Sequence, residues 1–424
     1  MNKMLGYRCS LCRAEYGPSE VTYTCPKDGG NLDVVLDFEA LRTKFQPADI
    51  SSRSDPSLWR YLPLLPVAEI PGRSTPLHAA GGTPVFALDR IAERLGLKQL
   101  WLKDESRNPT ASFKDRASAL VVARAREIEA EVIVTASTGN AGAALAGMAA
   151  AVGQKAVVLA PRTAPPAKVA QLLVFGATVV LVDGTYDDAF DLTLKATKEF
   201  GWYCRNTGYN PFTAEGKKTA ALEIWEWWQT AHQEWHLQLG EGAGHPPLTV
   251  FVSVGDGNII SGLHKGFKDL FQLGWITRVP RLVGVQAIGS AAIANAFQAG
   301  TEVITPVSAN TLADSISVDL PRDGVRAVRA AKETGGTYIT VSDDEILSAV
   351  AELGLLGIFA EPAGATAYAG LLKARADSVV QGDDPVLVLN TGSGLKDVNA
   401  AMRAVGEAPV IEPTLKALKG ILRK

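Results

Sequence analysis

The segment EVIVTASTGNAGAALAG, residues 131–147, decides the fold class of this chain. Its first six residues form a short apolar run that predicts a buried strand, and STGN leads directly into an Ala-rich helical pattern. The alternation recurs: further strand-like runs lie at 98–103, 155–160, 178–183, 248–254, 281–286 and 385–390, and helical segments at 114–130, 140–152 and 187–200. Apolar strands that alternate with helices predict an α/β fold, in which helices cover both faces of parallel sheets.

Size and composition restrict the function classes. The chain has 424 residues, of which 47% are hydrophobic and 21% charged, as expected of a globular protein with two or three domains. A net charge of −3, with basic and acidic residues interspersed, gives no footprint for nucleic acid. The N-terminal residues lack the apolar core of a secretory signal, and no run is apolar for the ~18 residues that a membrane span needs. We therefore expect a cytoplasmic protein that binds neither nucleic acid nor membrane.

Three of the four cysteines lie within the first 25 residues. Cys9 and Cys12 have the Cys-x2-Cys spacing of a zinc knuckle, and Cys25 is followed by Asp28 where a fourth cysteine would be expected. A carboxylate can bind zinc but is a less usual structural ligand. Two interpretations stay open, namely a zinc site formed by these four residues and a ribbon that has lost its metal.

Two loops that follow predicted strands carry polar groups suited to chemistry. Lys114 opens the helix after the strand 98–103, and the positive potential of a helix N-terminus favours the neutral amine that attacks an aldehyde. Taken alone, a first-turn lysine is more often a solvated charge. The STGN turn, Ser137 to Asn140, brings hydroxyls and backbone N–H groups to a helix N-terminus, which suits a carboxylate. The alternative there is a simple N-cap.

Two further loops complete a ligand-binding pattern. Gly255-Asp256-Gly257-Asn258 follows the strand 248–254, and glycines allow the backbone to approach a phosphate closely. Thr391 and Ser393 follow the last predicted strand and offer hydroxyls. The four loops together suit one ligand that has an aldehyde, a ring and a phosphate, beside a carboxylate pocket.

Five segments resemble those of fold-type II pyridoxal 5′-phosphate (PLP) enzymes, in particular the threonine synthase group, in order from about residue 80 to 400. They are NPTASFKDR (108–116), STGN (137–140), VGDGNIISG (254–262), EPAGA (361–365) and TGSGLKD (391–397). The resemblance implies a two-domain, tryptophan synthase β-like fold, and such enzymes are usually homodimers. We expect a zinc-ribbon-like module at 1–36, a large PLP-binding domain at 37–110 and 205–424, and a small, mobile, substrate-side domain at 111–204.

The resemblance also implies roles for single residues. Lys114 would bond the cofactor aldehyde, Asn140 would face its ring hydroxyl and Thr391 its pyridine nitrogen. A hydroxyl at 391 does not enforce a protonated ring, which favours elimination over transamination. The phosphate would be held by Gly255, Asp256, Gly257 and Asn258, and the substrate carboxylate by Ser137, Thr138 and Gly139.

In the implied reaction, the amine of the amino-acid substrate displaces Lys114 from the cofactor. The freed Lys114 amine then removes the Cα proton of the substrate. Loss of the γ-phosphate of O-phosphohomoserine and addition of water at Cβ would then give threonine. Ala141 and Thr213 depart from the pattern of bacterial threonine synthases, which places a threonine and a basic residue at these two points. The substrate phosphate would then need other cations, for which the candidates are Lys168, Arg162, Arg205 and Lys217.

Two alternative functions stay open. TLADSISV (311–318) and EPAGA resemble threonine and serine dehydratases, so an ammonia-lyase or a β-replacing enzyme of the same fold is the first alternative. A binding protein that keeps the fold without PLP chemistry is the second. It is disfavoured because Lys114 and its surrounding loops are intact.

Overall fold

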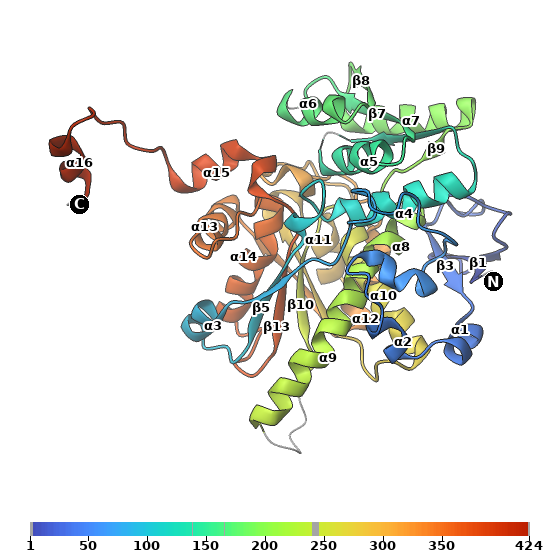
Figure 1. Cartoon of the computed structure of the whole chain (residues 1–424), viewed down its shortest axis with the longest axis horizontal. Coiled ribbons are helices and arrows are strands. Elements are labelled where there is room, and N and C mark those ends of the chain that lie inside the picture. The colour runs from blue at the N-terminus through green and yellow to red at the C-terminus, as the bar shows by residue number, and fades with distance from the viewer. Residues whose placement is uncertain (1–2, 138, 165, 240–245, 423–424) are drawn as a thin grey trace.

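The computed structural model describes residues 3–137, 139–164, 166–239 and 246–422. Three sheets organise this part of the chain (Figure 1). The N-terminal sheet contains β1 (Met4–Cys9), β2 (Glu15–Tyr16) and β3 (Leu32–Leu36). The six-stranded sheet contains β4 (Val85–Ala87), β5 (Leu100–Asp104), β10 (Thr249–Ser253), β11 (Arg281–Ala287), β12 (Thr337–Val341) and β13 (Val386–Asn390). The four-stranded sheet contains β6 (Val132–Ala136), β7 (Lys155–Pro161), β8 (Thr178–Val182) and β9 (Tyr203–Cys204).

The six-stranded sheet has the order β12-β11-β10-β13-β5-β4, and only β4 runs antiparallel to its neighbour. Every residue of β10 and β13 is buried, because helices cover both faces. Helix α14 (Pro362–Ala376) packs on one face, and α10 (Asn258–Leu273) with α12 (Gly324–Glu333) packs on the other (Figure 1). The parallel α/β fold predicted from the sequence is therefore confirmed, and each of the seven predicted strands is present.

The four-stranded sheet is parallel throughout, in the order β8-β7-β6-β9. It lies at the top of Figure 1 with α5 (Asn140–Ala150), α6 (Pro166–Val174) and α7 (Tyr186–Phe200). Helix α4 (Lys114–Glu127) packs on α5 and also on α8 (Phe212–Lys217), so it joins this sheet to the larger part. All four strands fall within the predicted small domain 111–204, whose boundaries themselves stay a prediction.

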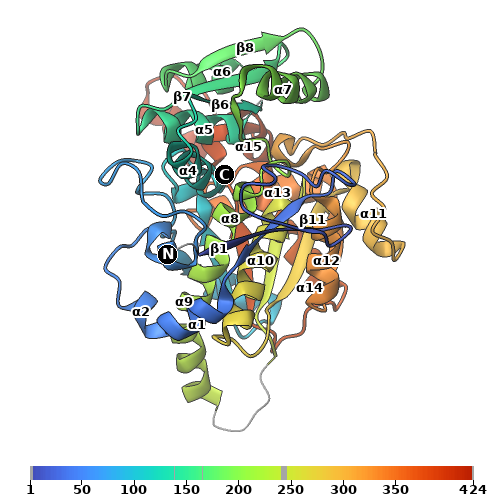
Figure 2. The ribbon, with the colours of Figure 1, turned by 90° about the vertical axis from the view of Figure 1, so that its right-hand side faces the viewer.

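The N-terminal strands form an antiparallel sheet, β2-β1-β3, that lies beside α8 and α10 (Figure 2). A buried guanidinium anchors it, because Arg326 Nη1 lies 2.6 Å from Asp33 Oδ1. Short helices follow this sheet in the segment 37–84. Asp37 caps the first of them by accepting a hydrogen bond from the Ala40 N–H, and Pro47 begins the second at a position where proline is favoured.

The remaining elements are helices and 3₁₀ turns. In the first part of the chain, up to the residues that follow β5, they are α1 (Phe38–Lys44), α2 (Pro47–Ser51), η1 (Leu58–Leu64), α3 (Asp89–Leu95) and η2 (Glu105–Arg107). In the second half they are α9 (Thr219–Leu239), η3 (Ile288–Ser290), α11 (Ala292–Gln298), η4 (Asp314–Ile316), α13 (Asp343–Gly354), η5 (Gly394–Lys396), α15 (Val398–Val405) and α16 (Leu415–Leu422). Within the described ranges, none of the helices has the length and apolarity that crossing a membrane requires.

Candidate active site

The loops singled out in the sequence meet at one cavity, at the carboxyl ends of strands from both large sheets. Lys114 reaches it from the start of α4, Asn140 from the start of α5 and Thr391 from the loop after β13. All seven residues predicted to bind the cofactor line it: Lys114, Asn140, Gly255, Asp256, Gly257, Asn258 and Thr391.

Lys114 is held in an environment that favours its neutral amine. Burial lowers the pKa of Lys114 below its ordinary value, the carboxylate of Asp256 raises it in part, and the guanidinium of Arg205 lowers it further. Desolvation is the largest cause of this effect in the structure, rather than the helix N-terminus expected from the sequence. A neutral amine is the nucleophile that an aldehyde requires.

Asn140 is oriented by a buried carboxyl group that the sequence analysis did not assign a role. Its amide Nδ2 donates to Glu361 Oε1 at 2.7 Å and to Ser315 Oγ at 3.2 Å. Burial raises the pKa of Glu361 to about 7. Glu361 belongs to the EPAGA segment and stands at the N-terminus of α14, so the segment was recognised while its first residue was not placed in the site.

The glycine loop after β10 requires residues without a Cβ. Gly257 has a φ of +88°, and a Cβ there would lie 2.7 Å from Ala327 Cβ and 2.9 Å from Asp323 O. At Gly255 a Cβ would lie 2.8 Å from Ile316 Cα. The loop leads into the first turn of the 16-residue helix α10, whose N-terminus favours an anion. This arrangement suits a bound phosphate.

Lys217 is a second buried lysine that lines the cavity. Its Nζ donates to Asn258 Oδ1 at 2.6 Å, and the Asn258 amide donates in turn to Asp323 Oδ2 at 2.7 Å. Burial, followed by the charges of Lys114 and Arg205, lowers its pKa well below the ordinary value. An anion bound beside Lys217 would stabilise its charged form, since an opposite charge offsets the cost of desolvation.

A larger cavity adjoins the first and shares Lys114, Asn140 and Asp256 with it. Ser137 and Gly139 line this second cavity, and Thr138 lies outside the described residues. The Ser137 hydroxyl accepts hydrogen bonds from the N–H groups of Gly139 and Gly142, at 3.2 and 2.9 Å. This geometry is that of a tight turn at the start of α5.

Two ion pairs border the second cavity and join its two sides. Lys168 of α6 pairs with Asp314 of η4, and Arg322 pairs with Asp187 of α7. Asp314, Asp187 and Arg322 line the cavity. Lys168 lies just behind Gly139, which lines the cavity. A Cβ placed on Gly139 would be 3.7 Å from Lys168 Nζ.

The other candidate cations lie elsewhere. Arg162 is exposed and pairs with Asp183 at 3.4 Å, outside both cavities. Arg205 is fully buried, donates to Ser118 Oγ and Thr207 Oγ1, and keeps one nitrogen, Nη2, without a hydrogen-bond partner among the described residues. Arg322 was not among the candidates from the sequence, but it lines the second cavity, whereas Arg162 does not.

Comparison with known proteins agrees with this geometry. Residues 77–392 match the family described as "Pyridoxal-phosphate dependent enzyme". The chain belongs to this family. It is 37% identical to a threonine synthase of Methanocaldococcus jannaschii, covering 98% of this chain and 99% of the relative. A threonine synthase of Methanosarcina acetivorans is 36% identical, with 98% of each chain covered. These relatives place the chain in the threonine synthase group of the family.

Solved structures show the same fold. Diaminopropionate ammonia lyase from Escherichia coli superposes with a TM-score of 0.64 at 22% identity, covering 76% of this chain and 87% of the other. A threonine deaminase from Solanum lycopersicum gives a TM-score of 0.63 at 21% identity, covering 85% and 95%. At this level of identity the likeness concerns the fold alone.

The residues present fit pyridoxal phosphate. A buried lysine with a lowered pKa faces the cavity, and a glycine loop that tolerates no Cβ lies opposite, beside the buried Lys217. Lys114 would hold the aldehyde, and Gly255 to Asn258 with Lys217 would hold the phosphate. When bound, this cofactor withdraws electrons from the Cα of an amino acid and so makes its proton removable.

Proposed function

We propose that the chain is a threonine synthase, which converts O-phosphohomoserine and water to threonine and phosphate. The observation that carries the proposal is the second cavity, which adjoins Lys114 and is bordered by two cations from opposite sides, Lys168 and Arg322. Such a substrate has two anionic groups, a carboxylate and a phosphate. A site that accepts it therefore needs two anion-binding regions within reach of one amine.

The two regions are supplied by different parts of the chain. The start of α5 at Asn140 supports a role for the STGN segment in holding the substrate carboxylate, because a helix N-terminus favours an anion. Arg322 and Lys168 are proposed to hold the substrate phosphate. Each is now paired with an aspartate, and a phosphate with two charges would compete with Asp187 and Asp314 for them.

Lys114 is proposed to move protons at the substrate carbons. Its amine takes the proton from Cα and can return a proton farther along the chain of the substrate, since one flexible amine reaches neighbouring carbons. Thr391 offers a hydroxyl rather than a carboxylate to the ring nitrogen, which fits elimination and replacement.

The test is an assay of the purified holoenzyme with O-phosphohomoserine, in which inorganic phosphate and threonine are measured together. We expect both products in equal amounts. Arg322→Ala should raise KM by about tenfold or more, because a hydrogen bond to a charged group contributes about 1.5–3 kcal/mol. Arg162→Ala, an exposed arginine outside both cavities, is the matched control and should leave KM unchanged. Absence of phosphate release would contradict the proposal.

A second candidate is a threonine or serine ammonia-lyase. It is favoured by the segment 311–318, because Asp314 and Ser317 line the second cavity and Ser315 lines both cavities. It predicts keto acid and ammonia from threonine or serine, in the absence of any phosphorylated substrate. Equal rates with phosphorylated and unphosphorylated substrates would favour this candidate over the first.

We propose that the chain forms a homodimer, on the strength of the family resemblance, and that it acts in the cytoplasm. Light scattering of the purified holoenzyme gives the oligomeric state, and a mass equal to one chain would contradict the first of these.

A further inference from the structure

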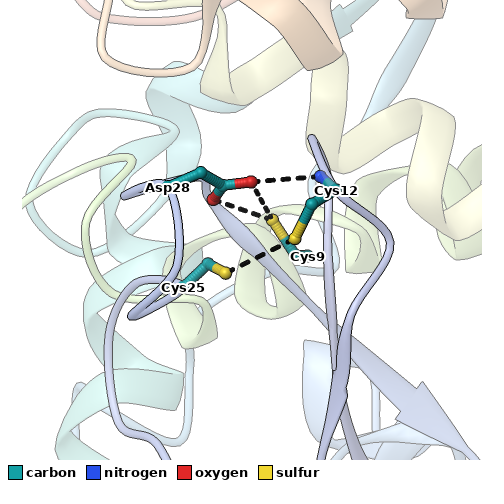
Figure 3. A group of neighbouring side chains, drawn as sticks. All are labelled: Cys9, Cys12, Cys25 and Asp28. Atoms are coloured by element: carbon teal, nitrogen blue, oxygen red, sulfur yellow. Dashed lines mark hydrogen bonds between the residues drawn. The ribbon is translucent and has the colours of Figure 1, made fainter.

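We propose that Cys9, Cys12, Cys25 and Asp28 bind one zinc ion, and that this ion fixes a loop that supports the substrate cavity. Their four potential ligand atoms all lie within 4.8 Å of one another. Figure 3 shows the three sulfurs and the carboxylate converging on one point. Cys9 ends β1 and Cys12 lies in the loop that follows it, whereas Cys25 and Asp28 lie in the loop before β3, so an ion would link the two loops through side chains.

The distances between the ligand atoms match a tetrahedral site. Zinc–sulfur bonds of about 2.3 Å and zinc–oxygen bonds of about 2.0 Å give tetrahedral edges of about 3.8 Å between two sulfurs and about 3.5 Å between sulfur and oxygen. The Cys12 and Cys25 sulfurs are 3.7 Å apart, and Cys9 Sγ is 3.3 Å from Asp28 Oδ1. A disulfide between Cys12 and Cys25 would require sulfurs about 2.05 Å apart.

Surrounding groups orient the ligands toward that point. The Asp28 carboxylate accepts hydrogen bonds from the N–H groups of Gly30 and Cys12, at 2.9 and 3.2 Å, and the Leu11 N–H donates to Cys9 Sγ at 3.3 Å. Gly30 lets the second loop approach, since a Cβ there would lie 2.8 Å from Cys9 Sγ. Outer contacts of this kind hold metal ligands in position.

The chemistry of the ligand set selects zinc. Three thiolates and one carboxylate offer soft and hard donors in a closed tetrahedron, which suits a structural ion without redox activity. Cys9 and Cys25 are buried while Cys12 and Asp28 are exposed, so an ion can enter from the surface. All four ligand positions are filled by protein, hence the ion has a structural role.

The second loop reaches the substrate cavity through Asn31. The Asn31 amide donates to the carbonyl oxygens of both Gly208 and Arg322, the latter at 3.0 Å. Gly208 follows Thr207, which lines both cavities, and Arg322 lines the second. The Arg322 N–H also donates to Asp256 Oδ1 at 3.2 Å. Asn31 is therefore a positioning residue for Arg322, and the ion is what fixes the loop that carries it.

Metal analysis of the holoenzyme tests the site. We expect about one zinc per chain after purification without chelators, and after exchange with cobalt an absorption spectrum of tetrahedral thiolate coordination. Cys25→Ser should lose the metal, whereas Cys204→Ala, a buried cysteine outside the cluster, should retain it. Asp28→Cys completes a four-thiolate site and should bind the metal more tightly, which keeps the test informative if the serine variant fails to fold.

Other results would overturn the site. They are holoenzyme without stoichiometric metal and without the cobalt spectrum, or a thiol titration with two thiols missing that reducing agent restores and chelator leaves unchanged. The latter would identify a disulfide instead of a metal site.

Hydrogen exchange of the holoenzyme tests the link to the cavity without using activity. Removal of the metal by a chelator should speed exchange at residues 9–31 and also at Gly208 and Arg322, while α13 stays unchanged. Asn31→Ala should speed exchange at Gly208 and Arg322 alone and keep the metal. Faster exchange confined to 9–31 after metal removal would overturn the link, and unchanged exchange at 9–31 would overturn the role of the ion.

Discussion

Burial lowers the pKa of Lys114 and Lys217 and raises that of Asp256 and Glu361, so all four titratable side chains of the first cavity are held toward their neutral forms. For Lys114 the neutral form is the reactive one. For Lys217 the bound phosphate would reverse the effect by supplying an opposite charge. One desolvated cavity can thus prepare a nucleophile and an anion-binding cation at the same time.

Lys114→Ala removes the amine that bonds the cofactor and moves the Cα proton. We predict that the purified variant lacks the visible absorbance band of lysine-bonded cofactor and that its kcat falls by about 10³-fold or more. Absorbance spectra and phosphate release, measured on the same preparations, check both effects. Lys195→Ala, an exposed lysine on α7, is the control and should keep wild-type absorbance and rate. A coloured and active Lys114→Ala protein would rule out the assignment.

Glu361 should make the stability of the cofactor-free protein depend on pH. Its pKa is about 7 in the fold, against 4.5 ordinarily, so between these values the folded state binds the extra proton and the free energy of unfolding falls as pH rises. Glu361→Gln removes this term. Relative to wild type, the variant should gain about 3 kcal/mol in urea unfolding between about pH 5 and pH 8. Exposed Glu407→Gln should show no such gain, and parallel pH profiles for wild type and Glu361→Gln would contradict the prediction.

At the scale of one element, helix α10 carries a left-handed glycine at each end, and this allows a matched comparison. A Cβ on Gly257 would collide with Ala327 and Asp323, whereas a Cβ on Gly274 meets nothing within 4 Å. Both alanine variants should lose about 1 kcal/mol through the positive φ. Only Gly257→Ala should also weaken cofactor binding, by about tenfold or more, in a titration followed by absorbance. Equal affinities in the two variants would argue against the glycine loop as the phosphate site.

The sequence predicted those strands that form largely apolar runs, and it missed β12, TYITV, which contains two threonines and a tyrosine. Strands such as β6 and β10 are apolar throughout, and the loops after them carry the residues that meet in the cavity. Strands β4 and β9 have three and two residues, too short to show a period, and they escaped prediction. Lys217 and Glu361 reach the cavity because α8 and α14 pack beside it. The sequence of each helix alone does not show where that helix packs. Lys168 was expected to bind substrate, and its pairing with Asp314, 146 residues away, depends on tertiary structure in the same way.

At the scale of the whole molecule, a buried ionic network lies beneath the active site and joins β5, η2, α4 and α9. Arg116 pairs with Glu105 at 2.7 Å and with Glu223 at 2.6 Å, and Lys103 pairs with Glu223 at 2.8 Å. Two cations and two anions balance, so the network carries no net charge. Because Arg116 stands two residues after Lys114, the same contacts fix the start of α4 and the position of the reactive amine.

Glu223→Gln should therefore destabilise the whole fold. It leaves Arg116 and Lys103 facing one carboxylate in a site from which water is excluded, and breaking a buried ion pair costs about 3 to 5 kcal/mol. Urea unfolding measures this as a lower midpoint with an unchanged slope. Glu131→Gln, in an exposed pair with Lys155, should lose less than about 1 kcal/mol.

The contribution of Glu223 to stability should also depend on pH. Burial opposes ionisation of Glu223, but the charges of Arg116 and Lys103 outweigh burial and hold the pKa of Glu223 below the ordinary range. The contribution of Glu223 is therefore present above about pH 4.5 and is lost as pH falls. The difference between wild type and Glu223→Gln should accordingly shrink in acid, and a difference independent of pH would show that packing rather than charge is responsible.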